Sequence, residues 1–343
     1  MKKSYLSQIL IHFVLVTLFV QCYKEEPKPD QPDQTNVNNV YVVGNEVDLS
    51  HKQGVKMWKN GEDTNITDFT LNWNKKAISV FVSSSDVYIL YHEYDIIKLW
   101  KNGVITEISD EEFNKATSMY VSGPDVYISG FKYTSKGLSY ARLWKNGTLT
   151  DLSEGIYTSE ANSVFVSGSD VYVAGIANDL YSYPTARLWK NGIGTNLPGQ
   201  EDMSNAFSVF VKDNDVYVAG VDIYIDGLPK SYPTIWKNGV ASHLSDKYEM
   251  ATAHSVFVSD SAVYVAGHVN NFAKLWINGI ETNLSDGTEL ADARSVFVSG
   301  QDVYVAGNIL TRGVLWKNGV ATNISNDSVI SSVAYSVFVT SNQ

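Results

Sequence analysis

After residue 39 the chain alternates apolar and polar residues in short runs rich in Val, Ile, Tyr, Phe and Trp. One unit, beginning at Ala161, reads Ala-x-Ser-Val-Phe-Val, Asp-Val-Tyr-Val-Ala-Gly, a variable stretch, Leu-Trp-Lys-Asn-Gly and Thr-Asn-Leu. An alternation with a period of two predicts β-strands, because successive side chains of a strand point to opposite faces. Turn residues divide each unit into four such runs, which predicts four antiparallel strands and no helix.

The unit recurs seven times, at intervals of about 39 to 47 residues, a period typical of propeller blades. Its Ser-Val-Phe-Val run begins, with small changes, at Ser79, Ser118, Ser163, Ser208, Ser255, Ser295 and Ser336. Its Trp-Lys-Asn-Gly run, changed only at Ile277, contains Trp58, Trp100, Trp144, Trp189, Trp236, Trp276 and Trp316. Asn-Gly favours a tight hairpin, since both turn positions need positive φ. The sequence therefore predicts an all-β, seven-bladed β-propeller over residues 39–343.

The two ends of the repeat region complement one another. The first unit starts at Val40-Tyr41-Val42 without its Ser-Val-Phe-Val strand, and residues 336–339 at the end of the chain supply a strand of this kind. We therefore expect the C-terminal strand to join the N-terminal blade. This pairing closes the ring and leaves no blade edge unpaired at the junction.

The first 38 residues differ in composition from the rest. Lys2 and Lys3 precede an apolar run shorter than the roughly 20 residues of a transmembrane helix, so residues 1–21 are expected to be a signal peptide. Residues 22–38 are rich in Pro, Asp, Gln, Asn and Glu, a composition that favours a disordered tether.

The residues Leu18-Phe19-Val20-Gln21 before Cys22 resemble a lipobox, and Tyr23-Lys24-Glu25-Glu26 resembles the export signal of surface lipoproteins of Bacteroidetes. This resemblance implies that Cys22 is acylated and that the chain is anchored in the outer membrane, at the cell surface. Several acyl chains give stable attachment, whereas a single chain binds only marginally. The alternative is a secreted protein with one incidental thiol.

Charge and cysteine content exclude several classes of function. The formal net charge of −11 argues against a nucleic-acid partner, which would need Lys and Arg to neutralise phosphates. Cys22 is the only cysteine, so no intrachain disulfide or zinc knuckle can form. The histidines show no metal-ligand spacing and the acidic loops no calcium-loop pattern, so we expect neither a metal nor a cofactor.

The loops between the second and third strands are longest in three successive units, and they are rich in aromatic residues. The candidates for ligand binding at this rim are Phe131, Tyr133, Tyr140, Tyr181, Tyr183, Tyr224 and Tyr232. A tyrosine offers a flat apolar face together with a hydroxyl group, which suits a sugar or a protein hot spot. Alternatively, these rings pack only against their own loops.

A second candidate set is the variable residue x of Ala-x-Ser-Val-Phe-Val, whose neighbours hardly change. This residue is Ile78, Thr117, Asn162, Phe207, His254, Arg294 and Tyr335 in successive units. Because x opens the innermost strand, we expect these side chains around the mouth of the central channel. The alternative is packing between blades, since x shares its side of the strand with core valines.

No nucleophile elbow or phosphate-binding glycine loop occurs in the sequence. The sequence therefore favours a monomeric, membrane-anchored, non-catalytic binding module for an extracellular glycan or protein. A structural component of an outer-membrane assembly is the alternative. A third hypothesis is a glycan hydrolase or lyase that uses His254, Arg294 and Tyr335.

Overall fold

The computed structural model describes residues 38–109, 112–153, 157–178, 183–199, 202–225, 229–246, 250–260, 262–326 and 328–341. The chain divides into two compact units, Met1–Asn36 and Val37–Gln343, and all described residues belong to the second. The predicted signal peptide, Cys22 and nearly all of the predicted tether therefore lie outside the described residues. No helix in the described ranges is long and apolar enough to cross a membrane.

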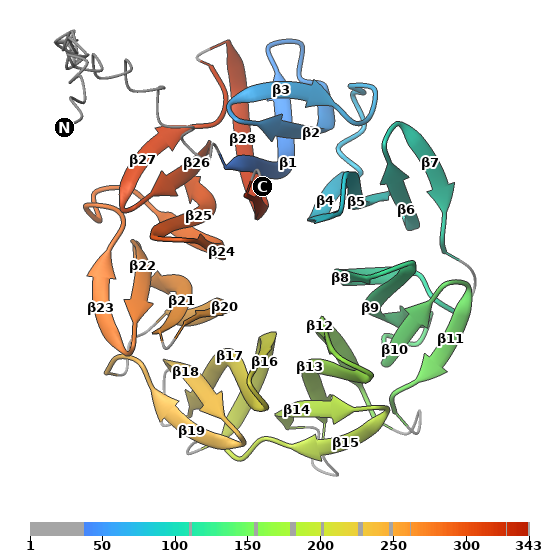
Figure 1. The fold of residues 1–343 in the computed structure, drawn as a ribbon, viewed down its shortest axis with the longest axis vertical. Helices are drawn as coiled ribbons and strands as arrows, with labels where there is room; N and C mark the ends of the chain where they lie inside the picture. The colour runs from blue at the N-terminus through green and yellow to red at the C-terminus, as the bar shows by residue number, and fades with distance from the viewer. Residues whose placement is uncertain are drawn as a thin grey trace, which may run out of the picture. The chain divides into compact units, whose positions relative to one another are not determined.

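The second unit consists of seven four-stranded antiparallel sheets arranged as blades around a ring (Figure 1). Blade 1 contains β28 (Val329–Thr340), β1 (Asn39–Asp48), β2 (Gln53–Lys59) and β3 (Glu62–Asn65). Blade 2 contains β4 (Lys75–Ser83), β5 (Asp86–Glu93), β6 (Ile96–Lys101) and β7 (Val104–Glu107). Blade 3 contains β8 (Lys115–Ser122), β9 (Asp125–Tyr133), β10 (Ser139–Lys145) and β11 (Thr148–Asp151).

The other four blades repeat this order, from an inner to an outer strand. Blade 4 contains β12 (Ser159–Ser167), β13 (Asp170–Asn178), β14 (Pro184–Lys190) and β15 (Ile193–Asn196). Blade 5 contains β16 (Met203–Lys212), β17 (Asp215–Tyr224), β18 (Lys230–Lys237) and β19 (Val240–His243). Blade 6 contains β20 (Ala251–Ser259), β21 (Ala262–Val269), β22 (Phe272–Ile277) and β23 (Ile280–Asn283). Blade 7 contains β24 (Ala291–Ser299), β25 (Asp302–Ile309), β26 (Arg312–Lys317) and β27 (Val320–Asn323), and the predicted seven-bladed propeller is confirmed.

The ends of the chain close the ring within blade 1. Strand β28 pairs antiparallel with β1, with Val40 opposite Val339 and Tyr41 opposite Phe338. The last strand of the chain is thus the innermost strand of the first blade, as the sequence predicted. The junction is held by the same main-chain hydrogen bonds as any other pair of strands in the ring.

A side-chain hydrogen bond reinforces the outer hairpin of every blade. In blade 1, Asn60 and Gly61 have φ angles of 52° and 87°, the left-handed conformation that this two-residue turn needs. The Asn60 side-chain oxygen also accepts a hydrogen bond from the backbone N–H of Val40, at 2.8 Å. The equivalent bond occurs at Asn102, Asn146, Asn191, Asn238, Asn278 and Asn318. The repeated Asn therefore shapes the turn and also ties it to the second strand.

In five of the seven blades the lysine before the Asn-Gly turn pairs with an aspartate that begins the second strand. In blade 4, Lys190 Nζ lies 2.8 Å from a carboxylate oxygen of Asp170. Equivalent pairs are Lys101–Asp86, Lys145–Asp125, Lys237–Asp215 and Lys317–Asp302. In blade 6 both partners are replaced together, by Ile277 and Ala262. Most of these lysines are therefore neutralised by a partner within their own blade.

The repeated tryptophans lie between neighbouring blades. Trp189, Trp236, Trp276 and Trp316 are at most 1% exposed and belong to four different interfaces. Trp236 also donates a hydrogen bond from its indole N–H to the carbonyl of Pro198, at 2.9 Å. Trp100 and Trp144 are only partly buried, although they pack against the same kind of core.

Around the channel, the inner strands contact one another through a closed circle of aromatic rings. Its members are Phe81, Tyr120, Phe165, Phe210, Phe257, Phe297 and Phe338, with neighbouring centroids 4.7–5.0 Å apart. The rings are tilted, an arrangement that aromatic pairs prefer. A serine of one inner strand also accepts a hydrogen bond from the next, as when Val256 N–H donates to Ser208 Oγ at 3.1 Å.

The buried tryptophans predict a large stability difference between two otherwise identical substitutions. Trp236→Ala should lower the free energy of unfolding by about 3–5 kcal/mol, because it removes a fully buried ring. Trp73→Ala removes the same side chain from a position that is 58% exposed, and should cost about 1 kcal/mol or less. Urea unfolding followed by circular dichroism measures both values. Equal losses would contradict the assignment of Trp236 to the core.

Candidate functional site at the channel mouth

The variable residue of each inner strand is the extra residue of a β-bulge. In blade 6, Ala253 pairs with Gly267 and Ser255 with Ala266, so His254 has no partner across the sheet. The same register shift leaves out Ile78, Thr117, Asn162, Phe207, Arg294 and Tyr335 in the other blades. A bulge redirects the side chain of its extra residue. Each blade therefore presents one variable side chain from an otherwise constant strand.

Several of these side chains are used within the ring itself. Thr117 Oγ1 donates a hydrogen bond to the carbonyl of Ala161 in the next blade, at 2.5 Å. Asn162 donates in the same way to the carbonyl of Ala206, at 2.9 Å. Ile78 packs against the core between blades 2 and 3. These contacts are the packing between blades that the sequence left open as the alternative, but Ile78 and Thr117 also line the cavity at the channel mouth.

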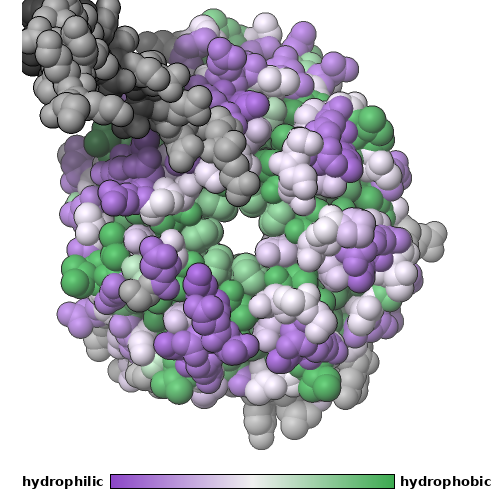
Figure 2. All heavy atoms as spheres, viewed as in Figure 1, coloured by the Kyte–Doolittle hydropathy of each residue, from purple (hydrophilic) through white to green (hydrophobic). Residues whose placement is uncertain are grey.

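Five of the seven variable residues line one cavity of about 580 Å³ at the mouth of the central channel: Ile78, Thr117, His254, Arg294 and Tyr335. The channel is visible as an opening in Figure 2. Two cations lie near the Tyr335 ring, with Lys76 Nζ at 5.7 Å and the Arg294 guanidinium at 5.4 Å from its centroid. Phe207, another variable residue, lies against the imidazole of His254, with centroids 5.9 Å apart.

The mouth is positively charged. Although Lys76 is exposed, desolvation by the surrounding wall lowers the pKa of its amine, and the charges of Arg294 and Lys115 lower it further. No carboxylate of the described residues forms an ion pair with Lys76. Lys115 pairs with Asp95 at 2.6 Å, but the Asp95 side chain is 82% exposed, so solvent screens that pair.

His92 lies in the same wall and is neutral. Burial lowers the pKa of its imidazole to about 4, and the lysine charges act in the same direction. Its Nε2 accepts a hydrogen bond from the backbone N–H of Ala116, at 3.0 Å, and so links blade 2 to blade 3. His92 therefore positions the wall and carries no charge at neutral pH.

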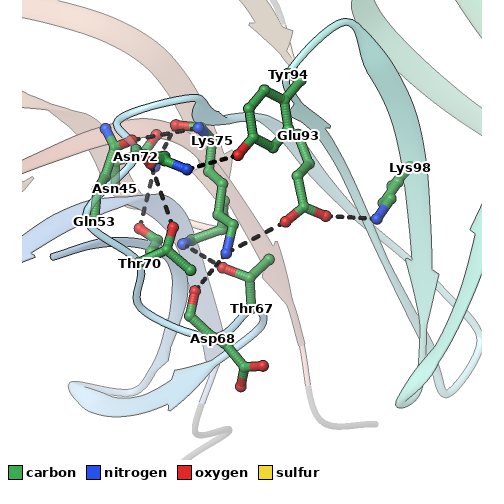
Figure 3. A network of polar contacts seen from close by, with 12 residues as sticks. Asn45, Gln53, Thr67, Asp68, Thr70, Asn72, Lys75, Glu93, Tyr94 and Lys98 are labelled. Carbon is green, nitrogen blue, oxygen red and sulfur yellow. Dashed lines mark hydrogen bonds and ion pairs between the residues drawn. The ribbon is translucent and has the colours of Figure 1, made fainter.

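A network of polar contacts holds one side of the mouth in place (Figure 3). Lys75 Nζ donates a hydrogen bond to the carbonyl of Asp68 at 2.6 Å and forms an ion pair with Glu93 at 3.3 Å. Asn72 donates to the hydroxyl of Tyr94 at 2.9 Å. The long loop between β3 and β4 is thereby fastened across the edge of blade 2.

This loop brings an aromatic pair that the sequence analysis missed. Trp73 and Tyr94 both line the cavity, and both are more than half exposed. The sequence did contain a clue to Trp73. The chain has eight tryptophans, seven of them belong to the repeat, and Trp73 is the one outside it. Lys76 and Lys115 were also missed, because single lysines at strand starts carry no recognisable pattern.

The predicted rim aromatics that the structure describes differ in their surroundings. Phe131 lines the mouth cavity, whereas Tyr133 is exposed beside a separate hollow. Tyr232 stacks on His243 at the outer side of blade 5, with centroids 4.2 Å apart. Tyr183 is half exposed, Tyr140 and Tyr224 are partly buried, and Tyr181 lies outside the described residues.

One cluster of possible metal ligands occurs in the described ranges. His254, His268 and Asp292 offer one ligand atom each, all within 4.8 Å of one another. The sequence did not suggest this cluster, because the three residues come from three strands in two blades. The spacing of His254, His268 and Asp292 along the sequence matches no metal-binding motif.

Comparison with known proteins identifies the fold and no family. No protein-family model matches the chain, and no curated protein matches it in sequence. The fold is similar to acylaminoacyl peptidase of Pyrococcus horikoshii, with 11% identity, a TM-score of 0.51, and 84% of this chain and 51% of that chain covered. It is also similar to a puromycin-hydrolyzing peptidase of Mycobacterium tuberculosis, with 10% identity, a TM-score of 0.55, and coverage of 84% and 52%. A prolyl endopeptidase is similar at 12% identity and a TM-score of 0.50, over 90% of this chain and 51% of that one.

The chain spans about half the length of these peptidases, and at such identities the likeness shows the fold alone. The comparison nevertheless corrects two predictions. The chain was expected to be a non-catalytic binding module for a glycan or protein, and not an enzyme. Both are contradicted, because the similar propellers belong to peptidases. The repeat specifies only the framework, so it carried no information about activity.

The burial of His92 predicts how stability depends on pH. As the pH falls, His92 of the unfolded chain binds a proton near its ordinary pKa of 6.5. His92 of the folded chain binds this proton only near its lowered pKa of about 4. Stability should therefore fall by up to about 3 kcal/mol as the pH drops through this window. His92→Gln, which keeps an acceptor for Ala116 N–H, should flatten this dependence. Urea unfolding at several pH values tests it, with His51→Asn at an exposed turn as control; an unchanged slope in His92→Gln would contradict it.

Proposed function

We propose that this chain is the substrate-selecting propeller of a peptide-hydrolysing enzyme, and that its channel mouth binds an anionic group of the peptide. The observation that carries the proposal is the place of Lys76 in the cavity wall, where no carboxylate of the described residues pairs with it, in a chain whose net charge is −11. The fold similarity to several peptidases supports peptides as the class of substrate.

A bound anion would relieve the repulsion among the cations of the mouth. Arg294 is already paired with Asp292 at 3.0 Å, whereas Lys76 is repelled by both Arg294 and Lys115. A carboxylate near Lys76 would favour its charged form, and the partly desolvated setting strengthens such a contact. Peptides with a free carboxylate therefore fit the mouth better than neutral peptides.

The aromatic wall offers a place for apolar side chains beside this anion site. Trp73, Tyr94, Phe131 and Tyr335 all line the cavity. Its volume of about 580 Å³ lies within the range of small-ligand sites and accommodates a few residues of a peptide. The combination of apolar rings with one uncompensated cation suits a peptide that carries both an apolar side chain and a carboxylate.

A matched pair of peptides tests this selectivity. Z-Gly-Gly-Phe forms part of the ligand in one acylaminoacyl peptidase structure, and it can be prepared as a free acid or as an amide. We expect the acid to bind at least about tenfold more tightly, a difference of about 1.4 kcal/mol, and the preference to shrink as salt is added. Isothermal titration calorimetry measures both affinities. Mass spectrometry of the same samples reports cleavage separately from binding.

The variant Lys76→Met should lower the affinity for the acid to that for the amide. Lys59→Met is the control, because Lys59 lies at the turn side of blade 1, next to Tyr41 and away from the mouth. Equal binding of acid and amide by the unaltered chain, or full binding by Lys76→Met, would overturn the proposal.

We also propose that the chain is a lipoprotein, anchored in the outer membrane through acylated Cys22 with the propeller at the cell surface. The support is the lipobox-like Leu18-Phe19-Val20-Gln21 and the Lys24-Glu25-Glu26 run that follows Cys22. Such an anchor would hold the propeller where extracellular peptides are met.

The anchor predicts distinct results for two sets of variants. Cys22→Ala should abolish labelling with radioactive palmitate and move the chain from the membrane fraction to the soluble fraction. Replacing Lys24, Glu25 and Glu26 by Ala should keep the chain in the membrane but remove it from the surface of intact cells, as measured by added protease. Palmitate labelling that persists in Cys22→Ala would exclude this cysteine as the anchor.

A further inference from the structure

Three ligand atoms from two neighbouring blades converge at the rim of the channel. His254 Nε2 lies 3.2 Å from His268 Nδ1 and 3.1 Å from Asp292 Oδ1. The third side of the triangle, from His268 Nδ1 to Asp292 Oδ1, is 3.2 Å. His254 and His268 come from the inner and second strands of blade 6, and Asp292 from the inner strand of blade 7.

The bulge in blade 6 makes this convergence possible. His254 is the extra residue of the bulge, and Gly267 stands opposite the residue before it. A Cβ at Gly267 would meet the carbonyl oxygen of Thr252 at 2.0 Å, so only glycine allows the two strands to approach this closely. The close approach places His268, the next residue, beside His254.

Protons alone do not satisfy the three contacts. Each contact needs one hydrogen, yet the two ring nitrogens carry at most one each, and the carboxylate carries none. With Asp292 ionised, at least one pair of atoms therefore faces each other without a hydrogen between them, whichever ring nitrogens are protonated. A cation that accepts a lone pair from all three atoms removes this conflict.

The triangle has the dimensions of one face of a metal coordination sphere. For an ion about 2.1 Å from each atom, the ligand–ion–ligand angles would be about 95–100°. These values lie between the ideal angles of octahedral and tetrahedral coordination. The ion would stand about 1 Å out of the plane of the three atoms. Two imidazoles and one carboxylate are a donor set typical of divalent first-row transition metals with open coordination positions.

Neighbouring groups orient the carboxylate for this role. Arg294 Nη2 binds the other oxygen of Asp292 at 3.0 Å, which leaves Oδ1 for the histidines. Arg294 Nε is itself fixed by a hydrogen bond to the side-chain oxygen of Asn308, at 3.1 Å. Such outer contacts are usual around metal ligands. The positive charge of Arg294 opposes a cation, and the two neutral imidazoles and the carboxylate must outweigh it.

From this geometry we propose that His254, His268 and Asp292 bind one divalent transition-metal ion of the Zn²⁺ class, with coordination positions left open. His254 is also part of the wall of the mouth cavity, so the site adjoins the space in which a substrate would lie. An ion held by three protein ligands can polarise a carbonyl or lower the pKa of a bound water. The proposal stands independently of peptide binding.

A metal titration of the full, untagged chain tests the site. After removal of metals with EDTA and dialysis, Zn²⁺ is titrated by isothermal titration calorimetry and Co²⁺ by its visible absorption. We expect one ion per chain and an increase in the midpoint of thermal unfolding with Zn²⁺, because the ion binds only the folded state. The absence of both binding and stabilisation in the unaltered chain would overturn the proposal.

Two variants and a matched control locate the ion. His268→Gln and Asp292→Asn should each weaken Zn²⁺ binding at least a hundredfold and abolish the Zn²⁺-dependent stabilisation. His243→Gln is the control, because His243 lies 3.1 Å from Asp222 in a histidine–carboxylate pair that belongs to no cluster of three ligands in the described part of the chain. Circular dichroism shows whether each variant is folded. Unaltered binding by both folded variants, or loss of binding in His243→Gln, would place the ion elsewhere and overturn the assignment.

Discussion

The blades of this propeller share no sheet with one another in the described structure, so the ring depends on side-chain contacts across the interfaces between blades. The circle of aromatic rings around the channel, from Phe81 to Phe338, is the innermost of these contacts and passes through every interface. Serine–backbone hydrogen bonds run beside it, and buried tryptophans lie further out. Because each interface reuses one pattern, the repeat in the sequence is a direct consequence of the repeat in the packing.

The bulge of the inner strand separates this framework from the chemistry. Residues on either side of it, such as Ala253 and Ser255, keep the strand paired, while the extra residue His254 is released from pairing. Substitution at that position leaves the ladder and the core intact. The chain can therefore carry a threonine that bonds to the next blade at one position and Arg294 or Tyr335 at another, with the same backbone in each.

The distribution of charge also separates the framework from the channel mouth. The lysines at the outer hairpins are largely neutralised by aspartates of their own blades, as in Lys190–Asp170. At the mouth, Lys76 has no such partner among the described residues, and Arg294 shares its carboxylate with two histidines. A net negative chain thus concentrates positive charge and convergent ring nitrogens at one place. The proposed peptide selection depends on this local positive charge, whereas the proposed metal site depends on the convergent ring nitrogens and the carboxylate of Asp292.

The sequence by itself determined the strands, the number of blades, the hairpin turns and the closure of the ring, because each depends on local alternation, on Asn-Gly chemistry or on the missing strand at Val40. It also identified the seven variable positions. Only the tertiary structure decided which of them share a site, since His254, His268 and Asp292 meet through the bulge and the packing of two blades. Trp73 reaches the mouth by the course of one irregular loop, for which no periodic pattern exists. Distances between side chains of different blades are set by packing around the whole ring, and no stretch of sequence encodes them locally.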